Sequence, residues 1–189
     1  WSSDVCSSDL EEIRRLQGKR QRHGPLRPYQ GARPPFAASL LQKGPGAVVA
    51  EFKPASPSKG EINLRASPEE IGRAYARGGA AAISVLTEER HFRSCLKHLQ
   101  AMQGPGLPLL RKDFLIHPVQ VEQTATTPAS ALLLIARLFL DEPALLAELI
   151  GLSRGFNLEP VVEIFDGAEL KLARQAGASI IQVNNRDLT

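Results

Sequence analysis

The feature that most restricts the fold of this chain is a repeated alternation of short apolar runs with amphipathic stretches, which begins near residue 47. The apolar runs do not alternate strictly with polar residues, a pattern typical of parallel strands covered on both faces. These predicted strands span residues 47–50, 80–85, 107–110, 131–135, 160–162 and 179–183. The stretches between them predict helices over residues 68–77, 92–102, 118–125, 142–154 and 167–176.

Local start and stop signals support the helices. Ser67 is suited to cap a helix that has Pro68 at its first position, and Gly78 is suited to end it. Repeated βα units with right-handed crossovers leave two architectures, an open doubly wound sheet and a closed (β/α)₈ TIM barrel. The six visible units place the chain in the α/β class.

Charge and cysteine content exclude several functions. The net charge is +3, and its excess lies in residues 11–33, where seven Lys and Arg residues accompany two Glu residues. The body therefore lacks the basic face of a nucleic-acid binder, and we interpret the basic segment as a solvated helix or arm. Cys6 and Cys95 form no metal or disulfide pattern, so we expect a reduced, cytoplasmic setting. Residues 131–140 are shorter than the about 20 residues of a membrane span, so we expect no membrane partner.

Motifs for several cofactor-dependent chemistries are absent from the sequence. The four histidines, His23, His91, His98 and His117, lack the spacing of metal ligands, so we predict no metal site. No GxGxxG follows a predicted strand, which argues against nicotinamide and flavin dehydrogenases, and no GxSxG nucleophile turn occurs. We expect neither a metal nor an organic cofactor.

Charged and amide side chains follow four of the predicted strands. They are Glu51, Lys53, Arg111, Lys112, Glu163, Asn184 and Arg186. Active sites of barrels and open α/β sheets form at the carboxyl ends of strands. Because residues two apart point to one face of a strand, Glu51 pairs with Lys53 and Asn184 with Arg186. We predict that two acids, two lysines, one arginine and one amide share one cleft and exchange protons there, namely Glu51, Glu163, Lys53, Lys112, Arg186 and Asn184.

The loop at residues 56–60, Ser-Pro-Ser-Lys-Gly, follows the first strand. Its hydroxyl groups, lysine and glycine suit an anion, but it lacks the spaced glycines of a Walker loop. A plain turn is equally compatible with these residues, so both interpretations stay open.

Four ordered blocks resemble the indole-3-glycerol phosphate synthase family over residues 33–189. They are Val49 to Gly60, Ile83 to Glu88 with Phe92, Leu110 to Phe114, and Val183 to Leu188. The resemblance implies a (β/α)₈ barrel over residues 47–189 behind an N-terminal helical extension over residues 11–46. It also implies a small-molecule sugar-phosphate substrate, 1-(2-carboxyphenylamino)-1-deoxyribulose 5-phosphate, which is closed to indole-3-glycerol phosphate in tryptophan biosynthesis with loss of carbon dioxide and water and without a cofactor.

The resemblance also implies roles for individual residues. Lys112 matches the general acid of ring closure and Glu163 the carboxylate of the later proton transfers. Glu51 orients groups or exchanges protons, and Lys53 contacts the anionic groups of the substrate. The substrate-binding positions that the family implies are Ser56, Phe92, Asn184 and Arg186.

The sequence departs from the family pattern at several places. Residues 126–130 replace a usual Gly-Ala-Asp run, and Phe165 replaces a frequent histidine. The family continues for about two further βα units that grip the substrate phosphate, so we expect a six-unit partial barrel that is inactive by itself. Residues 1–10 resemble translated adapter sequence, and we exclude them from the fold.

Two rival functions stay open at this stage. The first is a sugar-phosphate aldolase in which Lys112 forms a Schiff base with the substrate. The second is a degenerate, non-catalytic barrel whose basic segment at residues 11–33 binds a partner. For the enzyme of the resembling family, another tryptophan-pathway domain or enzyme is a candidate partner.

Overall fold

A computed structural model describes residues 3–63, 65 and 67–185 of the chain. Its main sheet has six parallel strands, and their order in space follows their order in the sequence. They are β1 (Val49–Phe52), β4 (Ala82–Leu86), β5 (Leu109–Lys112), β6 (Ala131–Ile135), β7 (Glu159–Ile164) and β8 (Ile180–Val183). All six predicted strands are thereby confirmed to within two residues at their ends.

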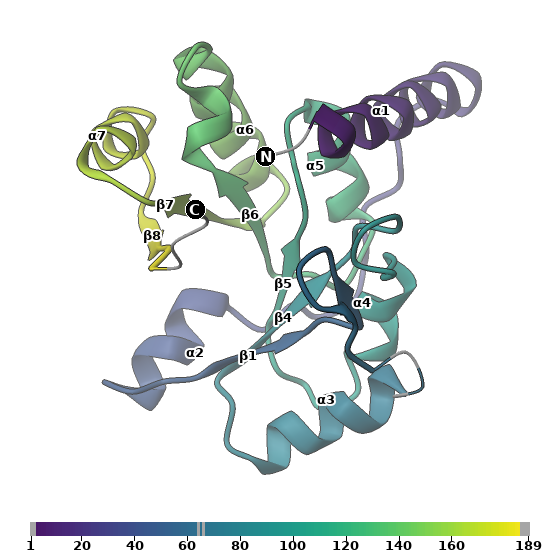
Figure 1. The fold of residues 1–189 in the computed structure, drawn as a ribbon, viewed down its shortest axis with the longest axis vertical. Helices are drawn as coiled ribbons and strands as arrows, with labels where there is room; N and C mark the ends of the chain where they lie inside the picture. Colours follow the sequence, from purple (N-terminus) through teal and green to yellow (C-terminus); the bar gives the residue numbers. More distant parts are fainter. Residues whose placement is uncertain (1–2, 64, 66, 186–189) are drawn as a thin grey trace.

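The order of the strands decides between the two predicted architectures. A doubly wound sheet reverses its strand order at a switch point, whereas a barrel adds each strand next to the preceding one. This sheet adds β4 through β8 successively beyond β1, with no reversal among the described strands. Helices lie around the outside of the curved sheet (Figure 1), so the described strands form part of a (β/α)₈ barrel.

Four of the five predicted helices match the structure closely. They are α3 (Pro68–Arg77), α5 (Pro118–Ala125), α6 (Pro143–Gly155) and α7 (Gly167–Gln175). Side chains cap three of them, because Ser67, His117 and Asp166 accept hydrogen bonds from first-turn backbone N–H groups.

The predicted helix over residues 92–102 is wrong at its start, because α4 covers only Lys97–Ala101. The carboxylate of Glu88 accepts backbone N–H groups of Arg90, His91 and Phe92 at 2.7–3.0 Å, and Arg93 has a φ of 52°. This loop geometry keeps the residues before Lys97 out of a helix. A short antiparallel hairpin, β2 (Ala55–Ser56) with β3 (Gly60–Glu61), was also not predicted.

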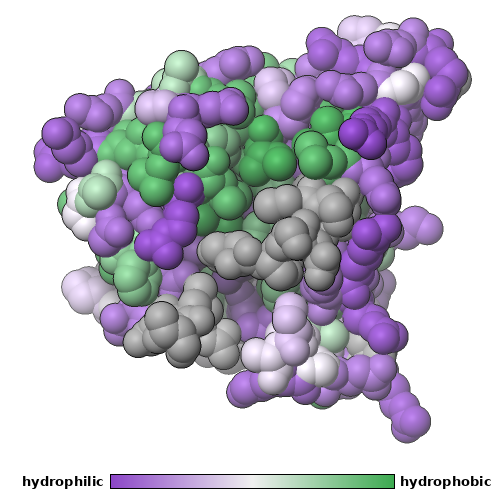
Figure 2. Space-filling view, turned by 45° about the horizontal axis from the view of Figure 1, so that its top comes forward, coloured by the Kyte–Doolittle hydropathy of each residue, from purple (hydrophilic) through white to green (hydrophobic). Residues whose placement is uncertain are grey.

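Two helices precede the barrel. Helix α1 (Ser3–His23) packs Ile13 and Leu16 against Val119 of α5, and its exposed side is hydrophilic (upper right in Figure 2). It begins earlier than residue 11, where we expected the helical extension to start. Helix α2 (Phe36–Lys43) buries Phe36 among barrel residues that include Leu110 and Leu133. No helix within the described ranges is long and apolar enough to cross a membrane.

A barrel residue caps the amino end of α2. The Glu159 carboxylate accepts the backbone N–H groups of Phe36 at 2.5 Å and Ala37 at 3.0 Å. Losing such a cap costs about 1–2 kcal/mol, so we expect Glu159→Ala to lower the free energy of unfolding by that amount in urea titrations. The control is Glu142→Ala, because the exposed Glu142 side chain does not cap α6. Equal stability of the two variants would contradict this role of Glu159.

Candidate active site

A pocket of about 790 Å³ opens where the strands end at their carboxyl termini. Seven of the eight predicted site residues line it, from β1, β5 and β7 and from the segments that follow β1, β4 and β8. They are Glu51, Lys53, Ser56, Phe92, Lys112, Glu163 and Asn184. The eighth, Arg186, lies outside the described residues. The structure thus places residues from the ends of separate strands around one pocket.

Two lysines share the carboxylate of Glu51. Lys53 Nζ donates to Glu51 Oε1 at 2.6 Å, and Lys112 Nζ donates to Glu51 Oε2 at 2.8 Å. The first pair joins residues two apart at the end of β1, as the strand periodicity predicts. The second joins β1 to β5 across β4, and the curvature of the sheet brings these two ends together. The three side chains are each 27–31% exposed, so a bound molecule can reach them.

Ion pairing determines the charge of Glu51. Burial raises the pKa of this carboxyl group, but the ammonium groups of Lys112 and Lys53 outweigh it, and the net pKa lies below its ordinary value. Glu51 is therefore ionised at neutral pH, and it holds both lysine heads in fixed positions.

This lowered pKa predicts how stability depends on pH. A group with a depressed pKa in the folded state stabilises the fold above its unfolded pKa, and that contribution is lost as the pH falls through the folded value. We expect Glu51→Gln to destabilise the protein most at neutral pH and progressively less in acid. Urea titrations across this range measure the difference, with the exposed Glu142→Gln as control. A difference that does not change with pH would contradict the ion pairs.

Two amides hold the second carboxylate, Glu163, which is 6% exposed. Gln182 Nε2 donates to Oε2 at 2.6 Å, and Asn184 Nδ2 donates to Oε1 at 3.2 Å. Amide donors orient a carboxylate without neutralising its charge. Gln182 was missed in the sequence, although it stands two residues before Asn184 and therefore points to the same face of β8.

Aromatic side chains form part of the pocket wall. The rings of Phe92 and Phe114 lie 6.5 Å apart between centroids, and Leu133 and Ile135 line the barrel interior beside them. The buried carboxylate of Glu88 fixes the backbone at Phe92, as described above. The pocket thus combines an apolar wall with the charged side chains of Glu51, Lys53 and Lys112. This combination suits a ligand with an aromatic ring and anionic groups.

The loop at residues 56–60 forms the turn of the β2–β3 hairpin. Ser56 Oγ accepts the backbone N–H of Lys59 at 3.3 Å, and Gly60 has a φ of 63°, which favours glycine. Ser56, Pro57 and Ser58 line the pocket. The turn interpretation is confirmed, and anion binding by this loop stays a prediction.

A further ion pair at the rim of the pocket was not predicted. Arg137 Nε donates to Glu169 Oε1 at 2.6 Å, and Glu169 Oε2 accepts the backbone N–H of Phe165 at 2.7 Å. Arg137 also lies over the Phe165 ring, 5.2 Å from its centroid. Phe165 is two residues beyond Glu163, so this pair fixes the turn after β7. In the sequence, Glu169 looks like an ordinary acidic residue in the first turn of a helix.

The fold and the pocket define a class of protein, an α/β-barrel enzyme whose site lies at the carboxyl ends of its strands. Within the described residues, no group of three or more His, Cys, Asp or Glu side chains could hold a metal ion. Acids, bases and aromatic walls are what the described pocket offers.

Comparison with known proteins identifies the family. A sequence model of indole-3-glycerol phosphate synthase matches residues 10–189. The chain is 44% identical to the indole-3-glycerol phosphate synthase of Roseiflexus sp., over 98% of this chain and 73% of the relative. It is also 44% identical to the indole-3-glycerol phosphate synthase of Desulfosudis oleivorans, over 82% of this chain and 59% of the relative. Indole-3-glycerol phosphate synthase 2 of Streptomyces coelicolor is also 44% identical to this chain, over 81% of this chain and 58% of the relative. The matched part of this chain thus spans between about three fifths and three quarters of these relatives.

The chain belongs to the indole-3-glycerol phosphate synthase family. Members of this family are carboxy-lyases of tryptophan biosynthesis, and their fold is the (β/α)₈ barrel. The resemblance found in the sequence is confirmed.

Proposed function

We propose that the full-length protein closes the indole ring, converting 1-(2-carboxyphenylamino)-1-deoxyribulose 5-phosphate to indole-3-glycerol phosphate, carbon dioxide and water. The observation that carries the proposal is the placement of Lys112 and Glu163 in one pocket, on β5 and β7, beside an aromatic wall. The chemistry needs an acid near a ketone, a base near the closing ring and an apolar place for the aryl group.

The first step forms a carbon–carbon bond. The aryl carbon that bears the carboxylate attacks the ketone carbon, and the ketone oxygen takes a proton from the Lys112 ammonium group. The carbon–carboxylate bond then breaks, carbon dioxide leaves, and the electron pair restores the aromatic ring. Glu51, which bonds Lys112 at 2.8 Å, keeps the ammonium head on the pocket side of β5.

The second step removes water. The nitrogen lone pair expels the hydroxyl group, which takes a proton from the Lys53 ammonium group and leaves as water. Glu163 accepts the proton that the neighbouring carbon releases as the ring double bond forms. Gln182 and Asn184 donate to the two oxygens of Glu163 and fix the orientation of its carboxylate. Lys53 contacts the anionic groups of the substrate, and Ser56, Phe92, Asn184 and Arg186 complete its binding.

Product formation tests this function. The full-length protein is mixed with the carboxyphenylamino substrate, and indole fluorescence and released carbon dioxide are followed together. Equal molar yields of both products are expected, and an analogue without the carboxylate is expected to give neither. Absence of indole formation from the authentic substrate would overturn the proposal.

The aldolase alternative makes a different prediction at Lys112. A Schiff-base lysine must reach the substrate as a neutral amine, whereas Lys112 donates to the Glu51 carboxylate here. We therefore expect borohydride treatment during turnover to trap no substrate adduct on Lys112, as judged by peptide mass.

We further propose a cytoplasmic location, with another tryptophan-pathway domain or enzyme as the candidate partner.

A further inference from the structure

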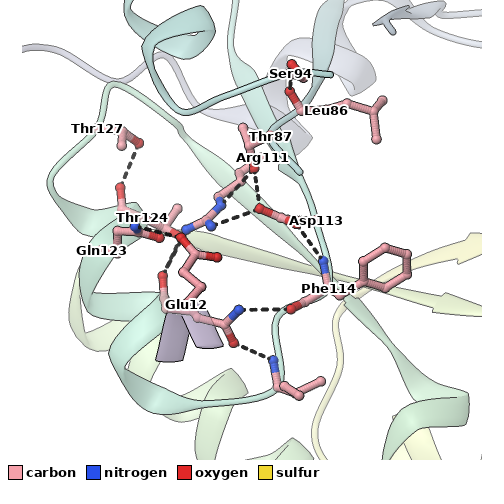
Figure 3. Close-up of polar contacts among 12 residues, drawn as sticks. Glu12, Leu86, Thr87, Ser94, Arg111, Asp113, Phe114, Gln123, Thr124 and Thr127 are labelled. Carbon is pink, nitrogen blue, oxygen red and sulfur yellow. Dashed lines mark hydrogen bonds and ion pairs between the residues drawn. The ribbon is translucent and has the colours of Figure 1, made fainter. Parts of the chain in front are cut away.

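A cluster of buried polar side chains lies behind β5, in the layer between the sheet and the outer helices. Behind β6 and β7 this layer is apolar. Between the sheet and the outer helices, β6 and β7 present residues such as Leu132, Leu134 and Val162 to an apolar core. At the end of β5 the same layer instead holds Arg111, Asp113 and Thr87. All three residues are buried, and Arg111 is 0% exposed to solvent. Figure 3 shows these side chains converging between the sheet and α5.

Arg111 connects two strand ends to a helix. Its Nε donates to Thr87 Oγ1 at 3.1 Å, and its Nη2 donates to Asp113 Oδ2 at 2.9 Å. Its Nη1 donates to Thr124 Oγ1 at 2.9 Å and to the carbonyl oxygen of Gln120 at 3.2 Å, both on α5 (Figure 3). The guanidinium group thus fixes the residue before Lys112 against α5.

Thr87 and Asp113 fix Lys112 from the other side. The backbone N–H of Thr87 donates to the carbonyl oxygen of Lys112 itself at 3.1 Å, while the Thr87 hydroxyl donates to Asp113 Oδ2. Asp113 Oδ1 accepts the backbone N–H of Phe114 at 3.0 Å. The carbonyl group of Lys112 and the side chains of both its neighbours are therefore held, while its ammonium head reaches Glu51 on the opposite face of the strand.

Stability alone does not account for this cluster. A buried ion pair is often no more stabilising than apolar residues of the same volume, because desolvation offsets the attraction between the charges. What the polar cluster adds is direction, since hydrogen bonds restrict backbone orientation more closely than apolar contacts do. We propose that Thr87, Arg111 and Asp113 are positioning residues that set the direction of the Lys112 side chain. Their expected effect on turnover rests on the function proposed above.

The test compares two substitutions that each remove one buried hydroxyl group. Thr87→Val keeps the side-chain shape, and the control Ser153→Ala removes a hydroxyl that bonds Leu149 O within α6, outside the pocket. We expect Thr87→Val to lower kcat of the full-length enzyme by about tenfold to a hundredfold, with KM changed by less than about twofold. Ser153→Ala is expected to leave kcat unchanged while lowering thermal stability similarly.

A second readout needs no substrate. Limited labelling of the free protein with an amine reagent gives the ratio of modification at Lys112 to that at Lys53, which is an internal reference because both lysines pair with Glu51. We expect Thr87→Val to change this ratio about threefold or more, and Ser153→Ala to leave it unchanged. If Thr87→Val fails to fold, Asp113→Asn takes its place in both measurements.

The two readouts separate the two proposals. If Thr87→Val changes the labelling ratio but the unsubstituted full-length protein does not turn over the substrate, the positioning role is supported and the proposed function is refuted. The positioning role would be overturned if Thr87→Val and Ser153→Ala had the same labelling ratio of Lys112 to Lys53 and the same kcat. This holds whatever the activity of the enzyme.

Discussion

Lys112→Met is expected to lower kcat for indole formation by about 10²–10⁴-fold, which is the contribution of a well-placed general acid. Methionine keeps the length of the side chain and removes its transferable proton, so substrate binding should change much less than kcat. Lys112 is also one of the two cations beside Glu51, and its loss leaves Lys53 as the partner of that carboxylate. Steady-state fluorescence assays of the full-length enzyme measure the effect.

The matched control for this variant is Lys171→Met on the exposed side of α7. It makes the same chemical change at a residue that does not line the pocket and should leave kcat at the wild-type value. Wild-type turnover by Lys112→Met would refute the assignment of the general acid, even if the family assignment stands.

Glu163→Gln is expected to separate the two halves of the reaction. Glutamine keeps the shape of the side chain but is a poor proton acceptor, so dehydration should slow by about 10²–10⁴-fold, while ring closure by Lys112 continues. In a single turnover, carbon dioxide should appear before indole, and a decarboxylated intermediate that still carries the hydroxyl group should accumulate. Quenched-flow sampling with mass detection measures both products.

The control for Glu163→Gln is Glu142→Gln, because Glu142 is exposed and does not cap α6 with its side chain. Its products should appear together, as in the wild type. Carbon dioxide and indole released in step by Glu163→Gln, at wild-type rate, would show that another group receives the proton.

Much of this fold was readable from local sequence. Ser67 with Pro68 fixed one helix start, and continuous apolar runs located the six strands, because capping and burial act on neighbouring residues. The failure at residues 92–96 arises in the loop before α4, where Arg93 has a φ of 52°, which a right-handed helix does not allow, and the Glu88 carboxylate binds the backbone N–H groups of His91 and Phe92. Amphipathic spacing carries no trace of such a contact.

The candidate site was predictable in part for the same reason. Strand periodicity placed Glu51 beside Lys53, but the contact between Glu51 and Lys112 depends on how the sheet curves across β4. Gln182 and Arg137 gain their roles only from partners on neighbouring elements, Glu163 and Glu169. Single-residue patterns describe faces of elements, whereas these pairs are properties of the assembled barrel.

The most direct test of the proposed chemistry is a crystal structure of the full-length enzyme with a substrate analogue whose ketone is reduced to an alcohol. Such a molecule binds but cannot close its ring. The proposed mechanism predicts its hydroxyl oxygen about 3 Å from Lys112 Nζ, with the aryl ring against Phe92 and Phe114 and the Glu163 carboxylate beside the carbon that loses a proton. An analogue bound in the pocket with this oxygen beyond hydrogen-bonding reach of Lys112 would contradict the mechanism.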